Sequence, residues 1–433
     1  MKKLTALFLA AGMVMAASAP ASAVDVKFNG RYQFTFQTQS KGFDGKNIEQ
    51  VSQRLRLGAT FAASENLSGY MEFQFGTEQW GTRDYKHGSY GKDGVMARMV
   101  YIDWKVPATA IKVRMGRQTV ALPSEAFGDN SVLSGGWGVH DGIVVSSPVT
   151  DWLGLSAMWM RAGADKDNLD VDEGANSDFF AAVANMKFNG ISGAVYGAYA
   201  ALDQAAAFDN VHDIKQDLPN ADGDAFWLGA TATLSYFDPF TLKLSAVYGE
   251  ADVNDSAAAD WAGWNVQAKA SYKLGFGTPV LGAWYASGDD DDAKNGKEGN
   301  MPSLAGRFMP TRSYNDNAKA LHAGNSRIDM DGTWGVQVGI EKVSFLSGLS
   351  HDFLVTYVEG TNDKKNVTSA AANYLTEEDA FVSFDLISSY KIYKNLSAHL
   401  ELSYIINDFN DQCKVGQDDE DDWRVGLTFE YKF

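Results

Sequence analysis

Apolar and polar side chains alternate along the chain from residue 26 to its end. Within residues 27–37 the apolar positions share one face: Phe28, Tyr32, Phe34 and Phe36. The pattern is clearest from Trp423 to Phe433. The odd-numbered residues there are all apolar or aromatic, and Arg424, Thr428, Glu430 and Lys432 lie between them. A period of two is typical of a β-strand with one apolar and one wet face. The sequence therefore predicts an all-β protein.

Two segments depart from this alternation. In residues 97–104 and 152–161 both faces are apolar. Two explanations stay open at this point. The outer face could contact another subunit, or the register of the strand could differ from the one that simple alternation assigns.

The connections between predicted strands alternate in length. Eight are short, and nine are long, near residues 39–51, 81–93, 119–138, 163–177, 201–224, 251–260, 288–330, 360–377 and 407–421. This gives 18 strands, or 16 if two short segments are hairpins within loops. An even count places both chain ends on the short-turn side. Short turns at one end and long loops at the other indicate a transmembrane antiparallel up-and-down β-barrel. A secreted β-sandwich or propeller would alternate too, but would not sort its turns in this way.

The N-terminus has the pattern of a secretory signal peptide. Lys2 and Lys3 precede an apolar stretch over residues 4–17, and Ala21-Ser22-Ala23 forms a small-x-small cleavage site. We expect residues 1–23 to be removed, which leaves a barrel over residues 24–433. No later segment offers the roughly 18 uninterrupted apolar residues that a spanning helix needs.

Charge and cysteine content exclude several classes of protein. The 433 residues include 37 Lys and Arg against 55 Asp and Glu, for a formal net charge of −18. This excess of acid argues against a nucleic-acid partner, which requires a basic stripe. The single cysteine, Cys413, excludes a disulfide framework and a cysteine-based zinc site. It falls in a predicted outer loop, as a lone thiol or an intermolecular link.

Two weaker constellations remain. Asp289–Asp292 and Asp418–Asp422 are acidic runs in predicted outer loops. They are either solvated loop charge or sites for Ca²⁺ or Mg²⁺ bridging lipopolysaccharide phosphates; no other cofactor is expected. His399, Glu401 and Ser403 supply the residue types of a hydrolase triad. Alternate residues of one strand lie roughly 6.6 Å apart, however, so a wet wall stripe is the simpler interpretation.

Several short stretches, in order, resemble the general porin family of Gram-negative outer membranes. They are Arg56-Leu57-Gly58, residues 67–74, Ala97-Arg98 with Val100-Tyr101, Met115-Gly116-Arg117-Gln118, residues 122–129 with Ala126 as an insertion, and the terminal Phe433. The resemblance implies a homotrimer in outer-membrane lipid and lipopolysaccharide. It also implies a third long loop, at about residues 119–138, that folds into the lumen. Phe433 would be read by the barrel-insertion machinery. Porins of this family usually have 16 strands, so an 18-stranded barrel would be a departure.

The resemblance also implies a constriction in the pore. Basic residues on the wall, Arg56, Arg98 and Arg117, would face the acidic Glu125 on the inward loop. Glu72 matches a glutamate of the wall, and Asp129 is a looser candidate on the loop. The insertion at Ala126 changes the loop relative to the family.

Strand parity gives a partly independent assignment. It places Arg54, Arg56 and Glu72 on the polar face. In residues 111–118 it places Lys112 and Arg114 on that face and leaves Arg117 off phase, a difference that a bend at Gly116 would reconcile. The polar face as a whole carries more Lys and Arg than Asp and Glu.

These features together predict a water-filled outer-membrane channel, not an enzyme. We expect passive diffusion of small hydrophilic solutes and ions, with a weak preference for small anions beneath an acidic mouth. One alternative is a substrate-specific channel for an organic acid, an inorganic anion or a sugar. Further alternatives are a barrel hydrolase and a structural or adhesive barrel with a plugged lumen.

Overall fold

The computed structural model describes residues 24–40, 47–80, 95–133, 139–164, 176–202, 223–253, 260–289, 299–304, 308–311, 330–364, 375–410 and 421–433. The predicted signal peptide and Cys413 lie outside these residues. The described residues form one sheet of eighteen antiparallel strands, which confirms the predicted count. The strands are β1 (Asp25–Gln39), β2 (Ile48–Ser64), β3 (Leu67–Gln79), β4 (Val95–Lys105), β5 (Lys112–Thr119), β6 (Val139–Pro148), β7 (Leu153–Ala164), β8 (Asn176–Phe188), β9 (Ile191–Leu202), β10 (Gly223–Leu234), β11 (Phe240–Val253), β12 (Trp261–Tyr272), β13 (Thr278–Ala286), β14 (Thr333–Leu346), β15 (Leu349–Gly360), β16 (Ala380–Tyr393), β17 (Leu396–Asp408) and β18 (Asp422–Lys432).

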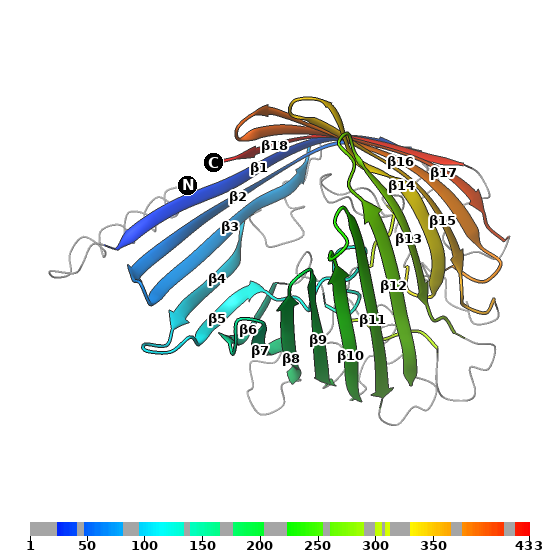
Figure 1. Cartoon of the computed structure of the whole chain (residues 1–433). Helices are drawn as coiled ribbons and strands as arrows, with labels where there is room; N and C mark the ends of the chain where they lie inside the picture. Colours follow the sequence, from blue (N-terminus) through cyan, green and yellow to red (C-terminus); the bar gives the residue numbers. More distant parts are fainter. Residues whose placement is uncertain are drawn as a thin grey trace.

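The sheet closes into a barrel because β18 pairs with β1 (Figure 1). At this seam Gly30 N donates to Phe433 O at 2.8 Å, and Phe433 N donates to Gly30 O at 3.1 Å. A Cβ on Gly30 would lie 2.2 Å from the Phe433 ring, so only glycine leaves room for this ring. A closed barrel has no free strand edge to template aggregation.

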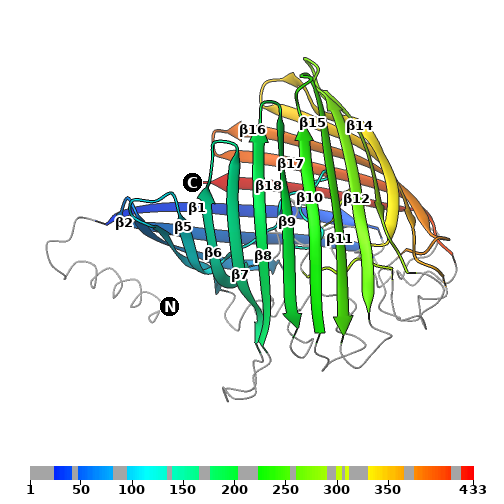
Figure 2. The same cartoon turned by 60° about the horizontal axis from the view of Figure 1, so that its bottom comes forward.

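The wall has an apolar outer face. On β1, Gln33, Thr35 and Gln37 point inward and are buried, whereas Phe36 points outward and is 45% exposed. Large apolar side chains are exposed in the same way on most other strands, as on β10 and β13, where Leu228 and Leu281 are 60% and 57% exposed. Figure 2 shows β6 to β12 side by side along one side of the wall. An exposed band of this kind suits contact with lipid. Among the described residues, no helix is long and apolar enough to cross a membrane.

The structure accounts for both segments in which alternation failed. The inward side chains of β7, Met158 and Met160, belong to an apolar cluster inside the barrel together with Val132 and Leu133. Both faces of β7 are therefore apolar because the inner one is covered by chain. On β4, the register against β3 shifts between Glu72 and Phe73, so one residue of β4 is left over and the alternation slips. The second explanation, a register that differs from simple alternation, applies to β4.

Candidate functional site: the barrel interior

A row of arginines lines the inner wall where β1, β2 and β3 meet. Arg31 on β1 lies directly opposite Arg56 on β2, and residues directly opposite each other share a face. Arg54 Nη2 donates to Gln33 Oε1 at 2.8 Å, and Arg56 Nε donates to Gln74 Oε1 at 2.8 Å. Arg54 and Arg56 therefore lie on the face that strand parity assigned to them. The partner of Arg56 is a neutral amide, which orients the guanidinium without cancelling its charge.

Arg98 and Glu72 form an ion pair at the next strands. Two residues of β4, Arg98 and Met99, face Glu72 on β3, which is the arrangement of a β-bulge. The bulge directs Arg98 inward, and its Nη1 lies 2.7 Å from Glu72 Oε1. The Tyr70 hydroxyl donates to Glu72 Oε2 at 3.1 Å. Both predicted residues thus come together, and Glu72 offsets the charge of Arg98.

Arg114 points inward from β5, as parity predicted. It makes a two-pronged ion pair with Asp103 on β4, with Nε–Oδ1 at 2.6 Å and Nη2–Oδ2 at 2.8 Å. Its guanidinium also lies 4.0 Å from the centre of the Tyr101 ring. Asp103 was not among the predicted site residues, although it alternates in phase with Tyr101 on β4. Two hydrogen bonds and a ring contact fix this arginine in place.

Arg117 lies on the outer face, contrary to the placement that the resemblance implied. β5 pairs with β6 without a register shift, so Arg117 points to the face opposite that of the inward Arg114 and Gln118. Arg117 lies opposite Asp141, and the Nη1–Oδ2 distance of their ion pair is 2.9 Å. Gly116 has a φ of 123°, but this irregularity does not turn the next side chain inward. Strand parity gave the correct face.

The segment after β5 contacts the inner wall of the opposite side. Ser245 on β11 and Gln267 on β12 lie opposite each other and are buried, whereas neighbouring Tyr248 and Trp264 are exposed outside. Ala126 N donates to Ser245 Oγ at 3.1 Å, and Phe127 N donates to Gln267 Oε1 at 3.2 Å. Two backbone N–H groups of this segment are thus satisfied by inward-facing side chains of the wall.

Glu125 is buried in this segment and holds it together. Its Oε1 accepts hydrogen bonds from Ser131 N at 3.1 Å and Ser131 Oγ at 2.7 Å, and its Oε2 accepts one from Gln267 Nε2. Only 4% of Glu125 is exposed. Burial raises its pKa to about 7, although these hydrogen bonds favour the charged form. Glu125 therefore ties the segment to the wall. The resemblance had implied that it faces the basic residues of the wall, and the structure does not place it there.

The exposed side of the same segment carries Asp129. Together with Lys269 on β12 and Glu341 on β14 it lines a cavity of about 230 Å³. Lys269 Nζ lies 2.7 Å from Glu341 Oε1 and 5.6 Å from the centre of the Phe127 ring. Asp129 is thus the acid of this segment that borders open space.

A second segment, between β13 and β14, also packs inside the wall. Leu304 N donates to Val132 O at 3.1 Å, and Ser303 Oγ donates to Ser131 O at 2.8 Å. Trp227 Nε1 on β10 donates to Pro302 O at 2.6 Å. The sequence showed this connection only as the longest loop, near residues 288–330. Nothing in its alternation distinguished an inward segment from an outer loop.

Asp385 fastens Thr311, in the same connection between β13 and β14, to β16. Thr311 Oγ1 donates to Asp385 Oδ2 at 3.0 Å, and Ser383 Oγ donates to the same oxygen at 3.2 Å. Ser403 Oγ on β17 donates to Asp385 Oδ1 at 2.6 Å, whereas His399 Nδ1 bonds Ser389 Oγ at 2.9 Å. Ser403 and His399 thus have different partners, which is not the arrangement of a nucleophile activated by a histidine.

The acidic runs lie mostly outside the described residues. Only Asp289, Asp421 and Asp422 of them are described. Within the described ranges, no group of three or more His, Cys, Asp or Glu could hold a metal ion. The interior therefore offers charged and polar side chains along a path, which suits the passage of polar solutes.

Comparison with known proteins bears on this interior. Residues 4–307 match the family model of Gram-negative porins. No curated protein matches the chain. Among solved structures, Pseudomonas aeruginosa OccK11 (OpdR) is 14% identical, with a TM-score of 0.59 over 94% of this chain and 96% of that one. OpdK with vanillate and OccK2 (OpdF) in complex with glucuronate, from the same organism, are 15% and 14% identical, each with a TM-score of 0.59 over 94% of this chain and 98% of the other. At these identities the structures show a shared fold. The matched family model covers well over half of the sequence, and the chain belongs to the Gram-negative porin family, as an outer-membrane channel for small solutes.

Proposed function

We propose that the channel passes small hydrophilic solutes and ions by passive diffusion, with a weak preference for small anions. The observation that carries the proposal is Arg56 in the arginine row on β1 and β2; Arg31 of this row lies 3.6 Å from Glu430 Oε2. Arg56 is bonded to the neutral side chain of Gln74, so its charge is available to a permeant. Rings or rows of one charge set ion preference in a narrow water channel. The segments after β5 and β13 supply the constriction, because they pack against the wall and against each other.

The test is the zero-current potential of the purified protein in a planar bilayer under a salt gradient. The wild-type potential should have the sign of an anion-selective pore. Arg56→Gln should move it toward cation selectivity, whereas Lys394→Gln removes the same charge from an exposed turn and should leave it unchanged. A clear cation preference of the wild type would refute the proposal.

A substrate-specific channel for organic acids is the second candidate. The fold is shared with structures solved with vanillate and with glucuronate, both of which are carboxylates. Arg56 offers planar donors that match a carboxylate. Flux of a small carboxylate that saturates at low concentration would favour this candidate. Flux that rises linearly would favour general diffusion.

We also infer that the barrel has no hydrolase activity, since Ser403 donates to Asp385 and not to His399. Lipid and peptide hydrolysis should be the same for the wild type and Ser403→Ala. Hydrolysis that disappears in this variant would contradict the inference.

We propose that the chain forms a homotrimer and that β5 to β8 face a neighbouring copy. Four charged residues of alternating sign form one row across these strands on the outer face. Each lies directly opposite the next: Arg117, Asp141, Arg161 and Asp178. Charges are costly against lipid tails, and a protein contact accommodates them better. Cross-linking of the detergent-extracted protein should give a three-chain species. Single chains at all cross-linker concentrations would contradict the proposal.

We propose further that the barrel-insertion machinery reads Phe433. This residue directly follows β18, the strand that closes the barrel against β1, and bonds Gly30 through its backbone. Deletion of Phe433 should reduce the amount of folded barrel in the outer membrane, measured by heat-modifiable migration in a gel. Equal amounts of folded protein with and without Phe433 would overturn this proposal.

A further inference from the structure

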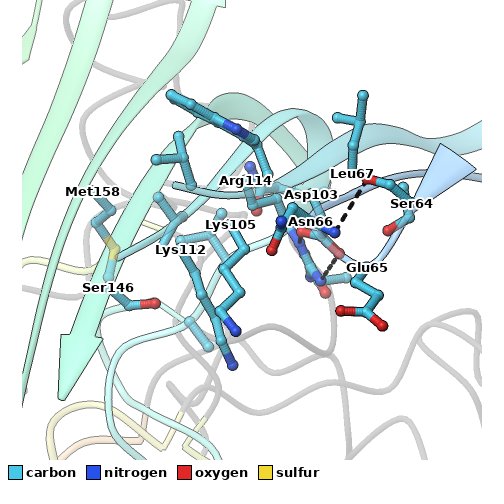
Figure 3. A pocket seen from close by; sticks show the side chains of 18 residues that line it. Ser64, Glu65, Asn66, Leu67, Asp103, Lys105, Lys112, Arg114, Ser146 and Met158 are labelled. Atoms are coloured by element: carbon cyan, nitrogen blue, oxygen red, sulfur yellow. Dashed lines mark hydrogen bonds and ion pairs between the residues drawn. The ribbon is translucent and has the colours of Figure 1, made fainter. Parts of the chain in front are cut away.

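A cavity of about 640 Å³ lies inside the barrel at its short-turn end (Figure 3). Its floor is the turn between β2 and β3, over residues 64–67, and one wall is the inward face of β4 and β5. Val120 and Ala121, at the start of the inward segment, close its other side. Short turns of outer-membrane barrels face the periplasm. A solute that has passed the inward segments therefore reaches this cavity before it leaves.

Two lysines project together into this cavity. Lys105 on β4 and Lys112 on β5 lie directly opposite each other on the inner face, and both are exposed. Figure 3 shows their side chains extending in the same direction with their ammonium groups at the ends. Like charges placed directly opposite on neighbouring strands destabilise a sheet. A bound anion would remove this repulsion.

No carboxylate of the described residues forms an ion pair with either lysine. Asp103 lies two residues from Lys105 on the same face of β4. Both of its carboxylate oxygens are bonded to Arg114, at 2.6 and 2.8 Å. Of the five charged side chains that line the cavity, three are basic, and Glu65 is the remaining acid. The lysine pair is thus a local excess of positive charge beside a fixed, already paired arginine.

The surroundings of the lysines are polar and suit an oxyanion. Ser64, Ser68 and Ser146 line the cavity with hydroxyl groups, and Asn66 adds an amide. Hydroxyl and amide groups donate hydrogen bonds to oxygens that the ammonium groups leave uncovered. Lysine binds phosphate and carboxylate as a point charge, so a pair of lysines fits a ligand with two negative charges.

We propose that this cavity is an anion-binding site for small solutes with two negative charges on oxygen, such as phosphate or a dicarboxylate. It is separate from the arginine row and lies on the periplasmic side of the inward segments. Its occupation would draw doubly charged anions through the constriction and hold them briefly at the exit. The site does not depend on the ion preference of the constriction itself.

The test is a titration of the full-length, detergent-solubilised protein with inorganic phosphate. Binding is measured from the broadening of the phosphate ³¹P resonance. Lys105→Gln with Lys112→Gln should weaken phosphate binding roughly tenfold or more, because it removes both ammonium groups that would make charge-assisted hydrogen bonds to the anion. Lys243→Gln with Lys273→Gln is the matched control. It removes two exposed lysines at the short-turn end of the barrel, Lys243 on β11 and Lys273 directly after β12. Both lie outside the cavity, so binding should be unchanged.

Two further measurements separate this proposal from others. Lys105→Arg with Lys112→Arg keeps the charge and should bind phosphate nearly as well as the wild type, which guards against misfolding of the glutamine variant. Arg56→Gln should move the zero-current potential and leave phosphate binding at the lysine pair intact. Equal phosphate affinity in the wild type and the doubly substituted glutamine variant, both shown to be folded by heat-modifiable migration, would overturn the proposal.

Discussion

Replacement of Glu125 tests how the inward segment is held against the wall. Its carboxylate accepts hydrogen bonds from Ser131 N, Ser131 Oγ and Gln267 Nε2, and both partner residues are almost fully buried. Glu125→Ala leaves Ser131 N and Ser131 Oγ without this acceptor, and Gln267 Nε2 keeps only its bond to Asn265 Oδ1 at 3.2 Å. Each buried unsatisfied group costs about 1–3 kcal/mol, so the attachment should weaken by about 3 kcal/mol or more. That loss raises the population of detached segment roughly a hundredfold or more.

The same carboxylate makes the attachment depend on pH. Burial raises the pKa of Glu125 from 4.5 to about 7, so the attached state binds a proton more tightly than the detached state. Between these two values the attached state therefore holds more protons, and the attachment weakens as pH rises. The whole shift corresponds to about 3 kcal/mol, an upper bound that is reached above pH 7.

Single-channel recording measures both effects as fluctuations of the open-channel current. The open-channel current of the wild type should fluctuate less at pH 5 than at pH 8, and Glu125→Gln should remove this dependence on pH. Asp129→Asn changes an exposed acid of the same segment and should keep the dependence. If Glu125→Ala is as quiet as the wild type, or if Glu125→Gln keeps the full pH dependence, the carboxylate does not hold the segment.

Three other substitutions test contacts of the interior and the seam. Arg98→Gln leaves Glu72 without its cation and should lower the free energy of unfolding by about 1–3 kcal/mol; the double variant with Glu72→Gln should lose less than the sum of the single losses in a urea titration. Asp385→Ala releases Thr311 in the connection between β13 and β14 and should increase single-channel conductance, and an unchanged conductance would show that this anchor is dispensable. Gly30→Leu displaces the Phe433 ring, which a Cβ would approach to 2.2 Å, and should lower the temperature at which heat-modifiable migration is lost.

The architecture could be predicted because it depends on local pattern. Alternation with period two assigns each residue of a strand to one face, and a closed barrel needs only that assignment and a sequence of turns. The strand count of eighteen and the inward placement of Arg54, Arg56 and Arg114 all follow from this rule. Even Arg117 obeyed it, and the error came from the placement that the resemblance implied.

The contacts of the interior depended on the tertiary structure. Arg98 faces Glu72 because a bulge adds one residue to β4, and no local pattern marks a bulge in an apolar stretch. Glu125 reaches Gln267 across 142 residues of sequence, and Leu304 reaches Val132 from another long connection. Such contacts arise only when the barrel has closed and brought opposite walls within reach of the same segment.

The sequence by itself therefore determined the strands, their faces and the charge of the inner wall, because side-chain direction along a strand is fixed by backbone geometry. The tertiary structure alone decided which charges are paired and which remain available to a solute. Arg98 and Arg114 are paired with Glu72 and Asp103, whereas Arg56 bonds a glutamine and the Lys105–Lys112 pair faces an open cavity. Pairing depends on distances between residues far apart in the chain, and only the closed barrel sets those distances.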